Sequence, residues 1–188
     1  MGDLSKHFSK HEMWCNCGCR RGVPHPFLLT KLEFLRSLTA AAMYINTRNH
    51  RGGSCPEYNA KIGGSLGSYH IVRWDPIIRA ELFLAVDFES AVKDPLELAR
   101  IIEKMDLDIG GQGIYYTISR PGGRVIMKPG FMHWDFGRPK RKDGGRRKWI
   151  HFRYGNKTKY IWLPKNRGFL QYSHYQLVDL AVETMNRG

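Results

Sequence analysis

The sequence contains no apolar run long enough to cross a membrane. Residues 1–5 lack the apolar stretch of a secretory leader, and the chain has neither an internal repeat nor a low-complexity linker. Acidic residues are scarce, since 17 Asp and Glu stand against 30 Lys and Arg, which gives a net charge of +13. We therefore expect a protein that is made in the cytoplasm, has no transmembrane segment and is attracted to polyanions.

The composition is that of a folded protein. Of the 188 residues, 42% are apolar and 12% aromatic, enough for one domain with a core. Leucines at helical spacing predict a helix over 27–43, Asp94 and Pro95 open a second helix that ends near Met105, and Ser173 caps a third. Strands are predicted at 82–88, 114–118, 125–127, 131–136, 148–154 and 157–163. The expected fold is α+β, a single domain in which helices flank a small antiparallel sheet.

Two histidines and an aspartate stand out in three fragments of the chain. The fragments read Ser68-Tyr69-His70, Ala85-Val86-Asp87 and Phe131-Met132-His133-Trp134-Asp135. Histidine nitrogen and carboxylate oxygen suit zinc, and three such ligands leave a fourth position for water. Asp87 lies in an apolar strand, where an ionised carboxylate is costly unless it is paired or bound to a cation. His133 and Asp135 are two residues apart, so both side chains leave the same face of a strand.

These fragments resemble the signature of the zinc D-Ala-D-Ala peptidases and their hedgehog-like relatives, which reads S-x-H-x-x-G-x-A-x-D and later H-x-D or H-x-H. Further landmarks follow the family's order over about residues 4–137. They are the opening Leu4-Ser5-Lys6-His7-Phe8-Ser9, the run Cys15-Asn16-Cys17-Gly18-Cys19, the segment from Cys55-Pro56 to Ser65, and Gly111-Gln112-Gly113-Ile114-Tyr115. The resemblance implies a zinc peptidase of the small phage-type class that hydrolyses stem or cross-link peptides of peptidoglycan. His70, Asp87 and His133 would be its zinc ligands.

The same resemblance implies roles for residues around the ligands. Asp135 is the candidate for the carboxylate that transfers a proton during catalysis, or alternatively for a partner that orients a ligand. Ser68 and Arg51 are candidates for binding the substrate, with Arg48 as the alternative arginine. A guanidinium can hold a peptide carboxylate through two hydrogen bonds. The other interpretation of both arginines is an ordinary solvated loop charge.

The spacing differs from the family pattern between the first two ligands. The family's aspartate follows its histidine by seven residues, whereas Asp87 follows His70 by seventeen. If the extra residues form a loop, the site is preserved, because loops lengthen at small entropic cost. If they displace the strand, the site is lost. Asp75, within the extra segment, is the fallback ligand.

Four cysteines allow two interpretations. Cys15, Cys17 and Cys19 are spaced by two, so on an extended segment their thiols share a face, and with Cys55 they could form a second zinc site. A disulfide from this group to Cys55 is the alternative in an oxidising compartment.

Basic residues concentrate between Arg138 and Arg167, where they alternate with aromatic residues. We expect residues 1–137 to form the peptidase-like core and 138–188 to form a basic-aromatic hairpin and a final helix of the same domain. The hairpin is either a plain solvated element or a polyanion-binding surface, and a non-catalytic protein that binds nucleic acid or wall polymer is the alternative function. Because no leader is seen, an enzyme that acts on the cell wall would be delivered by lysis or from a virus particle.

Overall fold

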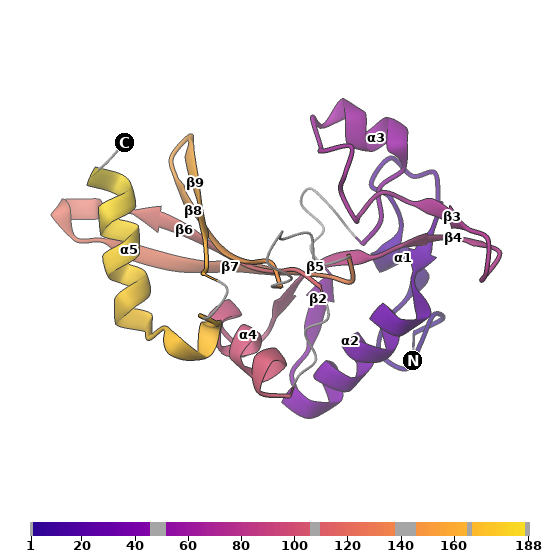
Figure 1. Cartoon of the computed structure of the whole chain (residues 1–188), viewed down its shortest axis with the longest axis horizontal. Coiled ribbons are helices and arrows are strands. Elements are labelled where there is room, and N and C mark those ends of the chain that lie inside the picture. Colours follow the sequence, from indigo (N-terminus) through magenta and orange to yellow (C-terminus); the bar gives the residue numbers. More distant parts are fainter. Residues whose placement is uncertain (1, 46–51, 106–109, 138–145, 165–166, 187–188) are drawn as a thin grey trace. The chain divides into compact units, whose positions relative to one another are not determined.

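The computed structural model describes residues 2–45, 52–105, 110–137, 146–164 and 167–186. It divides into two compact units, the first formed by Met1–Val92 with Trp134–Arg138 and the second by Lys93–His133 with Pro139–Gly188 (Figure 1). The predicted boundary at residue 137 is a different division of the chain and stays a prediction. None of the helices in the described ranges is long and apolar enough to span a membrane.

The first unit contains short helices and strands around one long helix. In chain order they are α1 (Lys10–Met13), β1 (Val23–Pro24), α2 (Pro26–Thr39), β2 (Met43–Ile45), α3 (Pro56–Lys61), β3 (Arg73–Asp75), β4 (Ala80–Phe83) and β5 (Ala85–Ser90). Three of these strands form a sheet in the order β1-β4-β3, with β1 parallel and β3 antiparallel to β4. β2 pairs antiparallel with β5.

The second unit contains the remaining elements. They are α4 (Pro95–Lys104), β6 (Gln112–Ser119), the 3-10 helix η1 (Pro121–Gly123), β7 (Ile126–Asp135), β8 (Lys148–Tyr154), β9 (Lys157–Trp162), the 3-10 helix η2 (Phe169–Gln171) and α5 (His174–Asn186). The last two residues of β7, 134–135, belong to the first unit. The second sheet has the strand order β2-β5-β7-β6-β8-β9, in which β6 is parallel to β8 and β8 antiparallel to β9.

Local sequence explains where the helices begin and end. α2 starts at Pro26, whose fixed φ suits the first helical turn, and it stops where Ala40 takes a left-handed conformation with φ of 50°. The Asp94 carboxylate accepts the Leu96 N–H at 2.8 Å and so caps α4. Ser173 caps α5 by accepting the Gln176 N–H at 3.2 Å. The predicted start of α4 at Asp94 and Pro95 and the predicted cap of α5 at Ser173 are thus confirmed, whereas α2 ends before residue 43.

The α+β fold class is confirmed, with two sheets and five α-helices among the described residues. The sequence did not indicate the parallel pairs β1–β4 and β6–β8, and it predicted two strands where β7 is continuous. The buried side chains of the first unit include Leu28, Leu32, Phe83, Phe88 and Trp134. Apolar packing around β5 and the end of β7 therefore fixes the strands that carry Asp87 and Asp135.

Candidate metal centre

His70 is held by hydrogen bonds at three different atoms. Its backbone N–H donates to Ser68 Oγ at 3.3 Å, and its carbonyl oxygen accepts the Ser54 N–H at 2.8 Å. The ring Nδ1 lies 2.8 Å from the carbonyl oxygen of Gly52. A carbonyl oxygen can only accept, so Nδ1 carries a proton and Nε2 is the nitrogen left to bind a cation.

Gly52 is required at its position by close packing. A Cβ added there would lie 2.7 Å from the ring of Phe83 and 3.0 Å from the sulfur of Met13. The next residue, Gly53, donates its N–H to the Met13 carbonyl at 2.9 Å. The backbone at Gly52 therefore lies against the core, which brings its carbonyl within reach of the His70 ring.

Asp87 lies next to His70 in the interior. It occupies the middle of β5 between Val86 and Phe88 and is only 4% exposed, while His70 is 6% exposed. Asp87 Oδ1 is 3.4 Å from His70 Nε2. Two acceptor atoms at this distance repel unless a proton or a metal ion lies between them. Ligands at about 2.1 Å in a tetrahedral zinc shell are spaced by roughly 3.4 Å, so the observed separation also fits shared coordination.

His133 completes the group. Each of these residues, His70, Asp87 and His133, offers one atom that could bind a metal ion. The three atoms lie within 4.8 Å of one another. His133 directly precedes Trp134 in the chain. The Trp134 ring packs against that of Phe88, with the ring centroids 6.5 Å apart. The structure thus brings together the three residues that the sequence predicted as metal ligands.

Asp135 is also buried, at 1% exposure, but it is not one of the three grouped residues. It follows His133 by two along β7, as the predicted strand periodicity requires. Its Oδ1 accepts the Gly137 N–H at 2.8 Å, a local bond that orients the carboxylate.

The extra residues between His70 and Asp87 form a hairpin. They fold as β3 and β4, and Trp74 and Ile77 are largely exposed. The Leu84 N–H donates to the Tyr69 carbonyl at 2.8 Å, so the chain returns to the point where the hairpin began. The Leu84 carbonyl in turn accepts the Phe136 N–H at 2.8 Å. These two bonds join the backbones next to His70, Asp87 and Asp135.

The other predicted residues have different surroundings. Asp75 Oδ1 accepts the N–H groups of Ile77 and Ile78 at 2.9 Å, so it stabilises the turn of the hairpin and lies outside the ligand group. Ser68 supports His70 through its hydroxyl oxygen. Arg48 and Arg51 lie outside the described residues, and their proposed role in substrate binding stays a prediction. Gly52 was not among the predicted site residues, although the paired glycines 52–53 are a signal of close backbone approach.

The four cysteines form a second group. All four are free thiols, and their Sγ atoms all lie within 4.8 Å of one another. Hydrogen bonds, chiefly with Cys19, lower the pKa of Cys17 to about 7, whereas burial raises the pKa of Cys55. The two candidates for metal binding that the sequence raised therefore both correspond to residues gathered in the fold.

Comparison of the chain with models of known protein families, with curated proteins and with solved structures finds no match.

Proposed function

We propose that this chain is a zinc-dependent peptidase that hydrolyses the stem or cross-link peptides of peptidoglycan. The observation that carries the proposal is the contact of His70 Nε2 with Asp87 Oδ1 at 3.4 Å. The other ring nitrogen, Nδ1, donates a hydrogen bond to the Gly52 carbonyl oxygen. A histidine that donates its second N–H to a backbone carbonyl is the usual arrangement of a zinc ligand. The motif resemblance of the three ligand fragments supplies the substrate class.

The donor set fits zinc and an open site. Two imidazole nitrogens and one carboxylate oxygen are typical protein ligands of catalytic zinc, which keeps one position for water or substrate. Zinc bound there would supply Lewis acidity toward water and toward the scissile carbonyl. Burial of His70 and Asp87 excludes bulk water from the ligands and strengthens their interaction with a cation.

We assign proton transfer to Asp135. It is a buried carboxylate on the same strand face as His133, and the Gly137 N–H fixes one of its oxygens. A carboxylate in this role accepts a proton from attacking water and returns it to the leaving amine. Ser68 and Arg51 remain the candidates for contacting the substrate.

The test uses purified chain with its zinc content measured, incubated with muropeptides. We expect release of a new amine or a shortened peptide, detected by mass spectrometry, and loss of this product with a chelator. Asp87→Asn should lose the zinc bound by His70, Asp87 and His133 together with the product, whereas Asp135→Asn should keep the parent zinc content and lose product. Asp75→Asn is the matched control, since this carboxylate only supports the hairpin turn. Intact muropeptides with zinc bound to His70, Asp87 and His133 would contradict the proposal.

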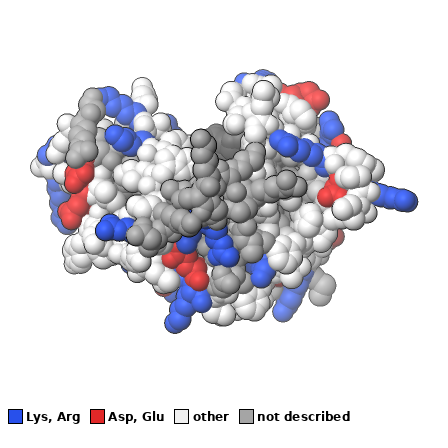
Figure 2. All heavy atoms as spheres, viewed as in Figure 1, with Lys and Arg blue, Asp and Glu red and all other residues white. Residues whose placement is uncertain are grey.

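One observation favours the non-catalytic alternative, a polyanion-binding protein. Along β9, Tyr160 and Trp162 are 51% and 56% exposed, and Lys157 and Lys159 precede them on the same strand. Figure 2 shows Lys and Arg side chains dispersed over the drawn face with Asp and Glu between them. A binding function would give an affinity for DNA that falls steeply with salt and drops in the Lys157→Gln/Lys159→Gln double variant, with muropeptides left intact.

A further inference from the structure

The cysteine group has the dimensions of a metal site. Cys55 Sγ lies 3.8 Å from Cys15 Sγ and 3.6 Å from Cys17 Sγ. Four sulfurs at about 2.3 Å from a tetrahedral zinc ion are spaced by roughly 3.8 Å. Cys55 thus contacts two thiols at once, an arrangement that one disulfide cannot satisfy.

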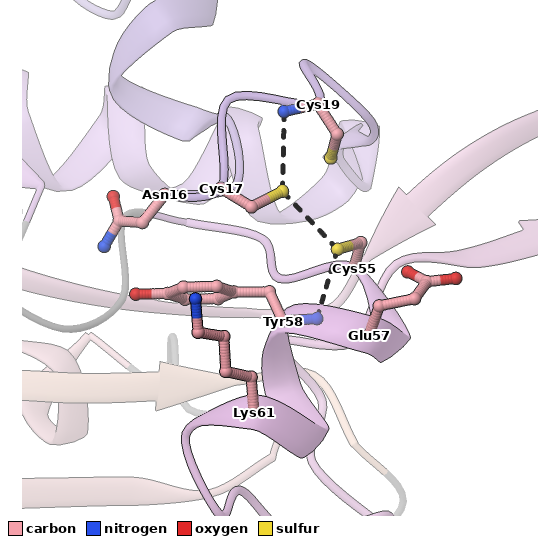
Figure 3. A pocket seen from close by; sticks show the side chains of 7 residues that line it. All are labelled: Asn16, Cys17, Cys19, Cys55, Glu57, Tyr58 and Lys61. Carbon is pink, nitrogen blue, oxygen red and sulfur yellow. Dashed lines mark hydrogen bonds between the residues drawn. The ribbon is translucent and has the colours of Figure 1, made fainter.

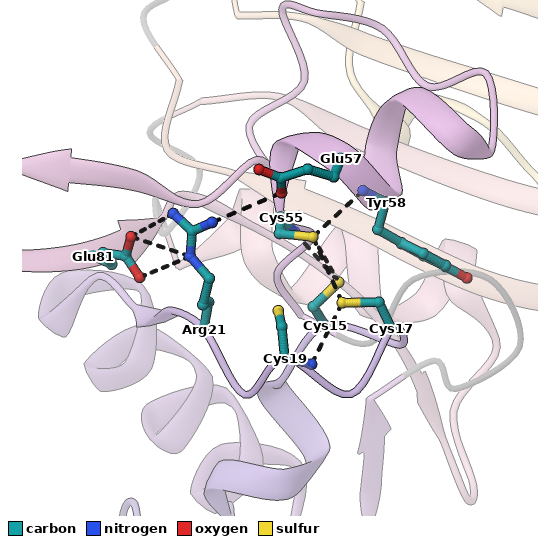
Figure 4. Close-up of polar contacts among 8 residues, drawn as sticks. All are labelled: Cys15, Cys17, Cys19, Arg21, Cys55, Glu57, Tyr58 and Glu81. Carbon is teal, nitrogen blue, oxygen red and sulfur yellow. Dashed lines mark hydrogen bonds and ion pairs between the residues drawn. The ribbon is translucent and has the colours of Figure 1, made fainter.

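Backbone N–H groups point at these sulfurs. Cys17 Sγ accepts the Cys19 N–H at 3.4 Å, Cys15 Sγ accepts the Cys55 N–H at 3.3 Å, and Cys55 Sγ accepts the Tyr58 N–H at 3.4 Å (Figure 4). Donors of this kind stabilise negative charge on sulfur and orient thiolate ligands. Three of the four sulfurs therefore already have the polar environment of a bound thiolate.

The backbone of the loop 15–19 bends so that the side chains of its three cysteines come together. Gly18 and Arg20 have positive φ values of 82° and 56°, which curl the chain between and after the cysteines. The Gly18 N–H closes a turn onto the Cys15 carbonyl at 3.1 Å. Arg21 then pairs with Glu81 at 2.6 Å and with Glu57 at 3.7 Å, which ties the loop to the segment that begins at Cys55.

The sulfurs are accessible from one side. Cys15 and Cys55 are buried and Cys17 and Cys19 exposed, and a pocket lined by Cys17, Cys19, Cys55, Tyr58 and Lys61 opens beside them (Figure 3). A metal ion can therefore enter an already gathered site. A cluster of several irons would need its thiolates farther apart than 4.8 Å, so the spacing favours a single ion.

We propose that Cys15, Cys17, Cys19 and Cys55 bind one zinc ion in a closed, structural tetrathiolate site. Soft thiolate ligands in a tetrahedral set select zinc among the common divalent ions. With four protein ligands, no coordination position remains for water, so the ion stabilises the fold and takes no part in hydrolysis. The zinc ion would join the loop 15–19 to Cys55 at the start of α3, a residue that is distant from that loop in the sequence.

The decisive measurement is zinc-edge X-ray absorption on full-length chain purified without oxygen. His70→Ala is used as the background because it disables the other candidate centre and leaves all four cysteines. We expect about one zinc per chain surrounded by sulfur at about 2.3 Å. Cys17→Ser in this background should lose most of that zinc, whereas Lys61→Gln, which changes the pocket and no ligand, should retain it.

A zinc shell of nitrogen and oxygen alone would overturn the proposal, as would a disulfide between Cys55 and Cys15 or Cys17 in the reduced preparation. Because the decisive readout uses native cysteines, misfolding of Cys17→Ser does not affect it. Peptidase activity is not part of the readout, so this inference and the proposed function can fail separately.

Discussion

The imidazole of His70 donates a hydrogen bond from Nδ1 to the carbonyl oxygen of Gly52 at 2.8 Å. This bond selects Nε2 as the nitrogen that faces Asp87. It also makes the orientation of one candidate ligand depend on a residue that has no side chain.

Gly52→Ala should weaken metal binding by His70, Asp87 and His133 without removing any of these side chains. The added methyl group would lie 2.7 Å from the Phe83 ring, so the Gly52 carbonyl must shift away from His70. Loss of such a ligand-orienting bond costs about 10–100-fold in metal affinity. Cobalt titration measures the change, since the cysteine and histidine centres differ in their absorption spectra. Gly67→Ala is the control, because its Cβ would meet only Ser65 Oγ at 3.7 Å, and an equal loss there would refute the mechanism.

Glu103 should be a strong contributor to the stability of the second unit. Its carboxylate, 5% exposed, pairs with Lys148 and accepts the N–H groups of Phe169 and Leu170 at 2.8 and 2.9 Å. Glu103→Gln removes the negative charge that pairs with Lys148 and should lower the free energy of unfolding by about 1–3 kcal/mol. Urea denaturation measures this.

Glu97→Gln on the same helix is the matched control. Glu97 pairs with Lys93 four residues earlier and is 47% exposed, so its loss should change stability by less than about 0.5 kcal/mol. Equal effects of the two substitutions would contradict the importance given to the buried carboxylate.

His151 should make the second unit acid-sensitive. Burial, with a smaller contribution from Arg153, lowers the pKa of His151 from 6.5 to about 4. The unfolded chain therefore takes up a proton below pH 6.5 that the folded chain refuses until about pH 4. The free energy of unfolding is therefore highest above pH 6.5 and falls progressively as the pH is lowered from 6.5 to about 4.

His151→Phe keeps a ring between Tyr115 and Tyr160 and removes the titrating group. The variant should gain stability relative to the parent as the pH is lowered from 7 to 4 in urea denaturation series. His174→Phe, at an exposed position at the start of α5, controls for the loss of a histidine. Parallel curves for parent and His151→Phe would show that this prediction is wrong.

The sequence indicated the residues of the candidate metal group better than it indicated the strand connections. Alternation along a strand placed His133 and Asp135 on one face, and the apolar run around Asp87 indicated a buried carboxylate. The hairpin between His70 and Asp87 was one of two outcomes that the spacing allowed. It was realised through the Leu84–Tyr69 backbone bond, which no side-chain pattern encodes.

The error at β7 has a similar cause. Pro129 and Gly130 read as a break between two strands, yet β7 runs through them. A Cβ at Gly130 would lie 2.8 Å from the Tyr115 carbonyl oxygen, so the glycine reflects close approach of β6. Parallel pairing of β6 with β8 depends on contacts between segments distant in sequence, which local propensity does not contain.

The stretch 52–55 serves both candidate centres. Gly52 and Ser54 hold His70, while Cys55 belongs to the thiol group and donates its N–H to Cys15 Sγ. A one-residue insertion or deletion here would displace a support of one centre and a ligand of the other together. A change of length in this stretch should therefore impair both candidate centres together, whereas a substitution such as Gly52→Ala acts on only one of them.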